Sequence, residues 1–116
     1  MSSQVISKFL SLLKEYRLAN QHEKENELWD VRGTLEKHSN REFKFDLRPI
    51  QNLNNNLFGK KGSTKTKADK MVFNTKDKWI VVDIEELHNY LKNEKIKIIY
   101  LDKILSDFDW NIIINK

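Results

Sequence analysis

The chain has 116 residues, of which 39% are hydrophobic and 33% are charged. This length accommodates one domain with a modest core, so we expect a single domain over residues 1–116. The chain contains no cysteine, which excludes disulfides, thiolate catalysis and cysteine-based zinc sites. No segment approaches the ~18–20 consecutive apolar residues of a membrane-spanning helix. We therefore expect a soluble protein without membrane contact, and the lack of cysteine favours the cytoplasm.

The first 40 residues are predicted to be helical. Apolar residues recur at three- and four-residue steps over residues 3–18, which is the period of an amphipathic helix. A second helical stretch is predicted over residues 21–37, although its apolar residues are sparse and Gly33 weakens it by about 1 kcal/mol relative to alanine. Together the two stretches predict a helical hairpin or one long helix.

The remainder of the chain is predicted to alternate short strands and helices. Residues 42–47 alternate polar and apolar side chains, as in a half-buried strand. Asp83, with Glu86 three residues later, has the spacing of a helix N-cap. The other expected elements are a helix over 50–57, strands over 71–75 and 79–84 joined as a hairpin by 76–78, a strand over 96–101, a helix over 102–108 and a strand over 110–114.

The predicted fold class is therefore α+β. An N-terminal helical hairpin or long helix, in a helical region over residues 1–40, is expected to pack on a small mixed sheet of three to five strands in an α+β region over residues 41–116. The run Ile112–Ile114 is apolar on both faces of the last strand. Such a strand is either central in the sheet or an edge strand covered by the N-terminal helices or by another subunit.

The positive charge of the chain is concentrated in one segment. The net charge is +4, and residues 59–70, here called the basic loop, contain five lysines and one acid, so the rest is formally neutral. Glycines let backbone N–H groups approach an anion, hydroxyls donate hydrogen bonds and lysines supply charge, a combination that suits phosphate. The two residues between Gly59 and Gly62 do not match the spacing of a P-loop.

The basic loop predicts contact with a nucleic-acid backbone. Phe58, beside the loop, is a candidate for stacking on bases, whereas Phe73 and Trp79 are expected to be core residues. The other interpretation is a charged, solvated surface loop without a ligand. The predicted nucleic-acid-binding residues are Lys60, Lys61, Ser63, Thr64, Lys65, Lys67, Lys70 and Phe58.

The N-terminal region suggests a second kind of surface. Trp29 lies in a thinly apolar stretch close in sequence to Arg32 and Arg17. Tryptophan and arginine are enriched at the centres of protein interfaces, so these three residues are predicted to bind a partner protein. The alternative is that Trp29 closes the small core.

Catalytic signals are weak. Glu42-Phe43-Lys44, with Asp30 upstream, has the local form of the acid-x-lysine motif of metal-dependent nucleases, but Asp30 falls in a predicted helix rather than on a neighbouring strand. The three histidines are dispersed and do not have the spacing of metal ligands. We therefore predict no catalytic residue, no metal and no cofactor, and we retain a nuclease only as a minor alternative.

These patterns lead to two functional hypotheses. The first is a small, non-enzymatic nucleic-acid-associated protein that contacts phosphates through the basic loop. The alternative is a protein-interaction module, such as an inhibitor or immunity-type protein of a phage or mobile element, that binds a larger enzyme. The expected partner is accordingly a nucleic acid or a protein with an acidic surface, and a homo-oligomer is left open.

Overall fold

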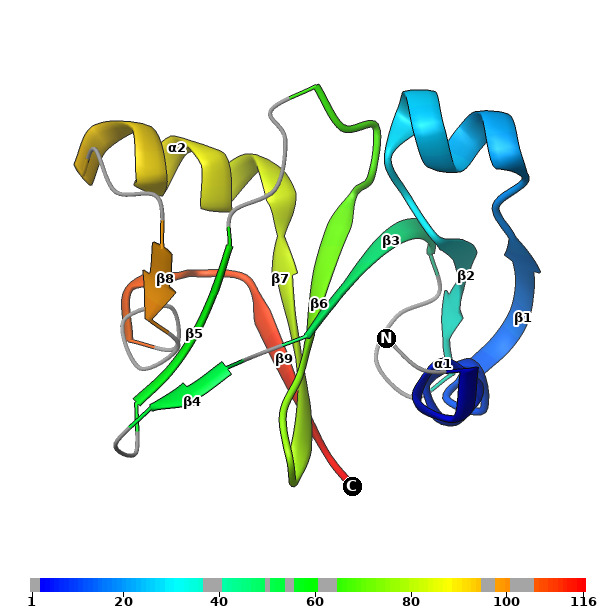
Figure 1. The fold of residues 1–116 in the computed structure, drawn as a ribbon, viewed down its shortest axis with the longest axis horizontal. Helices are drawn as coiled ribbons and strands as arrows, with labels where there is room; N and C mark the ends of the chain where they lie inside the picture. Colours follow the sequence, from blue (N-terminus) through cyan, green and yellow to red (C-terminus); the bar gives the residue numbers. More distant parts are fainter. Residues whose placement is uncertain are drawn as a thin grey trace.

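The computed structural model describes residues 3–36, 41–49, 51–53, 56–60, 65–94, 98–100 and 106–116 (Figure 1). Strands dominate the described part of the chain, and the helices are short. In chain order the elements are α1 (Ser3–Leu10), β1 (Leu13–Leu18), the π-helix η1 (Glu23–Glu27), β2 (Val31–Leu35), β3 (Glu42–Pro49), β4 (Gln51–Leu53), β5 (Asn56–Lys60), β6 (Lys70–Asn74), β7 (Lys78–Asp83), α2 (Ile84–Glu94), β8 (Ile98–Tyr100) and β9 (Asn111–Asn115).

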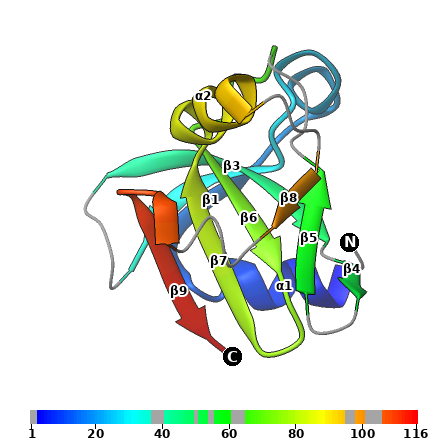
Figure 2. The ribbon, with the colours of Figure 1, turned by 90° about the vertical axis from the view of Figure 1, so that its left-hand side faces the viewer.

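A six-stranded mixed sheet organises the fold, in the order β1-β2-β3-β6-β7-β9. The pairing of β3 with β6 is parallel, and each of the other four pairs is antiparallel. A smaller sheet has the order β4-β5-β8 and stands beside the larger one (Figures 1 and 2). The parallel pair therefore joins two antiparallel halves, β1-β2-β3 and β6-β7-β9, into one sheet.

The core lies on both faces of the large sheet. In β7, Trp79 and Val81 pack into one cluster and Ile80 and Val82 into the other, because successive side chains of a strand point to opposite faces. The first cluster includes Phe9 of α1. The second lies on the α2 side of the sheet and includes residues of α2 itself. Burial on both faces explains why β6 and β7 are nearly continuous apolar runs.

The predicted N-terminal helical region is wrong. The helix α1 ends at Leu10, and residues 13–18 form strand β1 instead of continuing it. The second predicted helix is replaced by η1 and the strand β2. Leu28, with a left-handed φ of 62°, ends η1 and turns the chain into β2. The observed structure is thus mostly sheet, and not a helical hairpin on three to five strands.

The physical reason is that strand pairing outweighs local helical periodicity. Residues 31–35 alternate buried and less buried side chains, and they pair with β1 on one side and with β3 on the other. An amphipathic helix is stabilised mainly by packing its apolar face against the rest of the protein. Here the apolar side chains are buried as parts of paired strands instead.

The predicted helix over 50–57 is also wrong, because β4 and β5 occupy its described residues. The strand over 42–47, the 71–75/79–84 hairpin, the helix that begins after Asp83 and the final strand are confirmed as β3, β6–β7, α2 and β9. The strand over 96–101 is confirmed at 98–100. Residues 102–105 of the predicted short helix lie outside the described residues.

The last strand, β9, forms one edge of the large sheet (Figure 2). Of the two positions left open by the sequence, the structure therefore selects the edge. None of the helices in the described part of the chain is long and apolar enough to cross a lipid bilayer.

Gly33 is required at the centre of β2 because β1 bulges over it. The register between the two strands shifts between Leu13 and Tyr16, which places both residues on the same face. A Cβ atom at Gly33 would lie 2.5 Å from the backbone oxygen of Glu15 and 3.1 Å from Cβ of Tyr16. A backbone atom cannot move aside as a flexible side chain can.

Gly33→Ala is expected to lower the free energy of unfolding by about 1–3 kcal/mol, because the added methyl group forces β1 away from β2. Urea denaturation measures the change. The adjacent Arg32→Ala removes an exposed ion pair and should cost less than about 1 kcal/mol. An alanine at position 33 that leaves stability unchanged or raises it would show that the bulge is not rigid.

Candidate functional site

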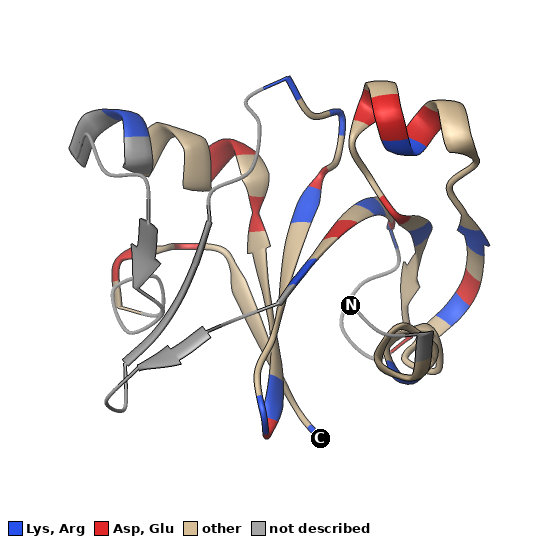
Figure 3. Cartoon of the chain, in the orientation of Figure 1, with Lys and Arg blue, Asp and Glu red and all other residues tan. Residues whose placement is uncertain are grey.

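Two lysines in the described part of the basic loop are exposed to solvent. Lys65 and Lys67 both lie at the surface, and Figure 3 shows basic positions in blue along the turn that leads into β6. Lys60 and Phe58 are on β5, but their side chains lie outside the described residues. The predicted residues Lys61, Ser63 and Thr64 also lie outside the described residues.

The end of this loop is fixed against the π-helix. The backbone N–H of Lys67 donates to the carbonyl oxygen of Glu27 at 2.8 Å. The hydroxyl of Thr66 donates to the carbonyl oxygen of Leu28 at 3.1 Å and accepts from the N–H of Ala68. The acidic segment η1 therefore lies next to this end of the loop (Figure 3), and its carboxylates reduce the positive potential that a phosphate would meet.

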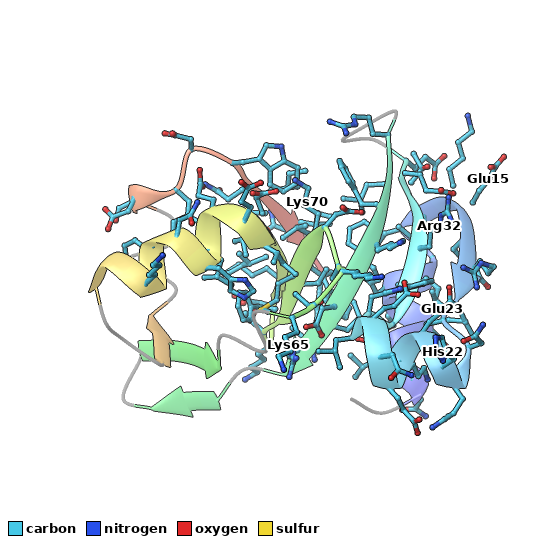
Figure 4. All side chains as sticks on the ribbon, turned by 90° about the horizontal axis from the view of Figure 1, so that it is seen from above. Glu15, His22, Glu23, Arg32, Lys65 and Lys70 are labelled. Carbon is cyan, nitrogen blue, oxygen red and sulfur yellow. The ribbon has the colours of Figure 1, made fainter. Side chains whose placement is uncertain are left out.

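Lys70 does not belong to this exposed set. Its side chain is buried, and its Nζ atom donates to Oδ1 of Asp83 at 2.8 Å. The ammonium group lies 3.7 Å from the ring centroid of Trp110 and 4.7 Å from that of Phe43, so cation–π attraction adds to the ion pair. Lys65 and Lys70 lie apart in Figure 4. The charge of Lys70 is thus neutralised inside the protein.

Asp83 connects this ion pair to helix α2. While Oδ1 accepts from Lys70, Oδ2 accepts the backbone N–H of Glu86 at 3.0 Å, which confirms the predicted N-cap. The carboxylate of Glu86 accepts from the backbone N–H of Trp110 at 3.2 Å. Glu86 therefore links α2 to the start of β9.

An open cleft of about 460 Å³ lies at this end of the sheet. Three chain segments meet there: the start of β3, the residues leading into β6, and the first turns of α2. They come together because β3 and β6 run parallel and begin at the same sheet end. The lining residues are Arg41, Glu42, Phe43, Thr66, Ala68, Asp69, Lys70, Asp83, Ile84, Glu85 and His88.

The cleft carries more negative than positive groups. Its four carboxylates belong to Glu42, Asp69, Asp83 and Glu85, and its two cations to Arg41 and Lys70. Lys70 is paired with Asp83, and the guanidinium of Arg41 lies 5.6 Å from the ring centroid of Phe43. Sequence reasoning missed this cleft because its residues come from distant segments. Three of its residues did carry local signals, namely the capping Asp83, Glu42 of the acid-x-lysine triplet and Lys70 of the basic loop, but nothing in the sequence joined them.

The three predicted partner-binding residues do not form an exposed patch. Trp29 is 1% exposed and belongs to the core, and its indole N–H donates to Glu27 at 3.1 Å. Arg17 is exposed and makes a two-pronged ion pair with Glu23, with both N···O distances at 2.8 Å. This arginine and the backbone N–H of Asn20 hold the pKa of Glu23 at about 2.

Exposed apolar side chains lie on the edge strand β1, next to the strand β2 that carries Arg32. Arg32 pairs with Glu42 across β2 and β3, on the sheet face opposite to Tyr16. Tyr16 is 53% exposed and Leu18 is 52% exposed, and both are on β1. The predicted helix placed Tyr16 on its apolar face, so the sequence offered no signal for the exposure of this residue.

The residues of the nuclease alternative do not converge on a metal site. Asp30 accepts the backbone N–H of Leu47 at 2.8 Å, Glu42 pairs with Arg32, and Lys44 lies 3.8 Å from Glu27. In the described ranges, no group of three or more histidine, aspartate or glutamate side chains is arranged to hold a metal ion.

A second, smaller cavity of about 210 Å³ lies beside a buried carboxyl group. Asp46 is 5% exposed, and its Oδ2 atom accepts from Arg48 at 2.9 Å. The pKa of Asp46 is raised to about 6. Burial is the main cause and the nearby Asp30 adds to it, while Arg48 acts in the opposite direction. The Nε atom of Arg48 is buried and has no hydrogen-bond partner in the described structure.

No protein-family model matches the chain, and searches of curated proteins and of solved structures returned no match. We therefore base the functional assignment on the geometry and charge of the described residues. Of the features above, the cleft combines depth, charge and access from solvent.

Asp83→Asn is expected to lower the free energy of unfolding by about 3 kcal/mol, measured by urea denaturation, because it leaves the buried ammonium of Lys70 without a counter-ion. Asparagine is itself a good N-cap, so the substitution tests the ion pair separately from the cap. The double variant Lys70→Met with Asp83→Asn should recover most of the loss. Equal unfolding midpoints for wild type and Asp83→Asn would contradict a role for the pair.

The raised pKa of Asp46 predicts a pH-dependent stability. A carboxyl group whose pKa is higher in the folded state binds its proton more tightly there, so stability decreases as pH rises from about 4 to about 6 and then levels off. Asp46→Asn should be more stable than wild type by up to about 3 kcal/mol at neutral pH and should lose this advantage below the window. Urea midpoints measured across this range test it, with the exposed Asp109→Asn as control.

Proposed function

We propose that the protein is a non-enzymatic protein-interaction module whose cleft receives a basic segment of a partner protein. The observation that carries the proposal is the cleft of about 460 Å³ with four carboxylates and two cations in its lining. A concave site in which several polar groups converge is a usual form of a binding site. Binding-site charge of one sign favours a ligand of the other sign.

The position of the charges supports a lysine or arginine side chain as the inserted group. Phe43 and Ile84 are buried residues of the lining and provide apolar surface for the aliphatic part of such a side chain. Glu85 is exposed in the first turn of α2, where it can meet the charged end. Lys70 and Asp83 neutralise each other, which leaves Glu42, Asp69 and Glu85 against Arg41 in the lining, and Glu42 is itself paired with Arg32.

Nucleic-acid association is the second candidate, favoured by the exposure of Lys65 and Lys67 beside the cleft. Two such lysines would neutralise about two phosphates and give a slope near −2 for log affinity against log salt. The acidic residues of η1 and of the cleft weaken this candidate, since they repel phosphate.

Fluorescence anisotropy with probes of opposite charge separates the two functions. The probes are a labelled peptide rich in lysine and arginine and labelled single- and double-stranded oligonucleotides, each titrated at two salt concentrations. We expect the peptide to bind and Glu85→Lys to weaken it about fivefold, because reversing one charge at a partly exposed site changes binding by about 1 kcal/mol. The double variant Lys65→Glu with Lys67→Glu should not weaken the peptide.

Glu36→Lys makes the same charge change at an exposed residue outside the cleft and serves as the matched control. If Glu36→Lys and Glu85→Lys weaken peptide binding to a similar extent, the peptide binds by nonspecific electrostatic attraction. That outcome would overturn the cleft assignment. Salt-dependent oligonucleotide binding that the double lysine variant removes would establish the second candidate. Failure of all probes to bind would exclude both.

A further inference from the structure

The edge strand β9 lacks the features that normally keep a sheet edge from pairing. It consists of Asn111, three isoleucines and Asn115, with no charged residue, no proline and no register shift against β7. Edge strands of monomeric proteins are usually protected by charged side chains, prolines or bulges. The opposite edge, β1, has such protection, because it contains a bulge and the charged residues Lys14, Glu15 and Arg17.

The charged residue that directly follows β9 is turned away from the strand edge. Lys116 follows the strand, and its Nζ atom donates to the carbonyl oxygen of Thr75 at 2.6 Å and also to Asn74. The same ammonium lies 4.5 Å from the ring centroid of Trp79. Lys116 is thus held against its own chain and does not stand in the path of an approaching strand.

The backbone groups of β9 that point outward are centred on Ile113. The N–H of Lys116 donates to the carbonyl oxygen of Asp77, so position 116 faces β7. In an antiparallel pair the facing positions alternate, so Ile112 and Ile114 also face β7, whereas Asn111, Ile113 and Asn115 present their N–H and C=O groups to the outside. No described strand lies beyond them (Figure 2).

We propose that β9 pairs with β9 of a second copy of this chain, antiparallel about a two-fold axis at Ile113. The sequence Asn-Ile-Ile-Ile-Asn reads the same in both directions, so this register places Asn111 opposite Asn115 of the partner and Ile113 opposite itself. The three outward-facing residues then meet as hydrogen-bonded pairs, each exchanging both backbone bonds. A two-fold interface requires this kind of self-complementarity.

The side chains fit the same register. Ile112 and Ile114 would face each other across the axis at the closer, non-hydrogen-bonded spacing, on the face where both already pack against the α1 side of the core. Ile113, which is 44% exposed, would contact its own counterpart on the other face. The two large sheets would become one continuous sheet, and a second copy therefore accounts for both the bare edge and the exposed isoleucine.

Sedimentation equilibrium tests the pairing on the intact protein. A five-residue edge is short, so we expect a weak, concentration-dependent dimer with a dissociation constant of roughly micromolar order. Ile113→Lys should raise that constant at least about tenfold, because two ammonium groups would meet at the axis. Tyr16→Lys makes a comparable change on the other edge and should alter the constant less than about twofold.

A disulfide test makes the register itself measurable. The chain has no cysteine, so Ile113→Cys introduces a single thiol. Paired residues at the axis would lie about 5.5 Å apart between Cα atoms, within the range that a disulfide spans. Mild oxidation should therefore join two copies of Ile113→Cys but not of Tyr16→Cys. A wild-type protein that stays monomeric at its highest soluble concentration, or cross-linking through position 16 instead, would overturn the proposal.

Discussion

The ion pair of Lys70 and Asp83 holds together the elements on which the rest of the structure depends. Lys70 begins β6, the strand through which the two halves of the large sheet meet, and Asp83 ends β7 and caps α2. The aromatic rings of Phe43 and Trp110 enclose the ammonium from β3 and from the approach to β9. One buried ion pair therefore connects three strands, the segment before β9 and a helix. Both of its residues also line the cleft.

The features that the sequence predicted correctly are those governed by local chemistry. The N-cap at Asp83 depends on residues within one turn, and the β6–β7 hairpin depends on two apolar runs separated by a short polar turn. The strand β1 was missed because its apolar spacing also fits a helix, and only pairing with β2 decides between them. Propensity is a weak guide where tertiary contacts compete with it.

The site was harder to predict than the fold for a related reason. In the sequence, Lys70 is one more lysine of the basic loop. Its burial depends on contacts with Phe43, 27 positions before it, and with Trp110, 40 positions after it. Charge density along the sequence therefore could not show that the ammonium of Lys70 is buried and paired. The cleft, and the exposure of Tyr16 and Leu18, likewise exist only after distant segments have been brought together.

The parallel contact between β3 and β6 also governs how the chain reaches this structure. The hairpin β6–β7 closes over residues 75–77 and the pair β1–β2 over residues 19–30, and both can form on the microsecond timescale. Pairing β3 with β6 requires closing the roughly 20 residues between them, at an entropic cost of about 2–3 kcal/mol before any ladder bond compensates. The docking of the two hairpins through β3 and β6 is then expected to be slower than the formation of either hairpin. Substitutions at this junction would slow folding, whereas those at the outer strands would mainly speed unfolding.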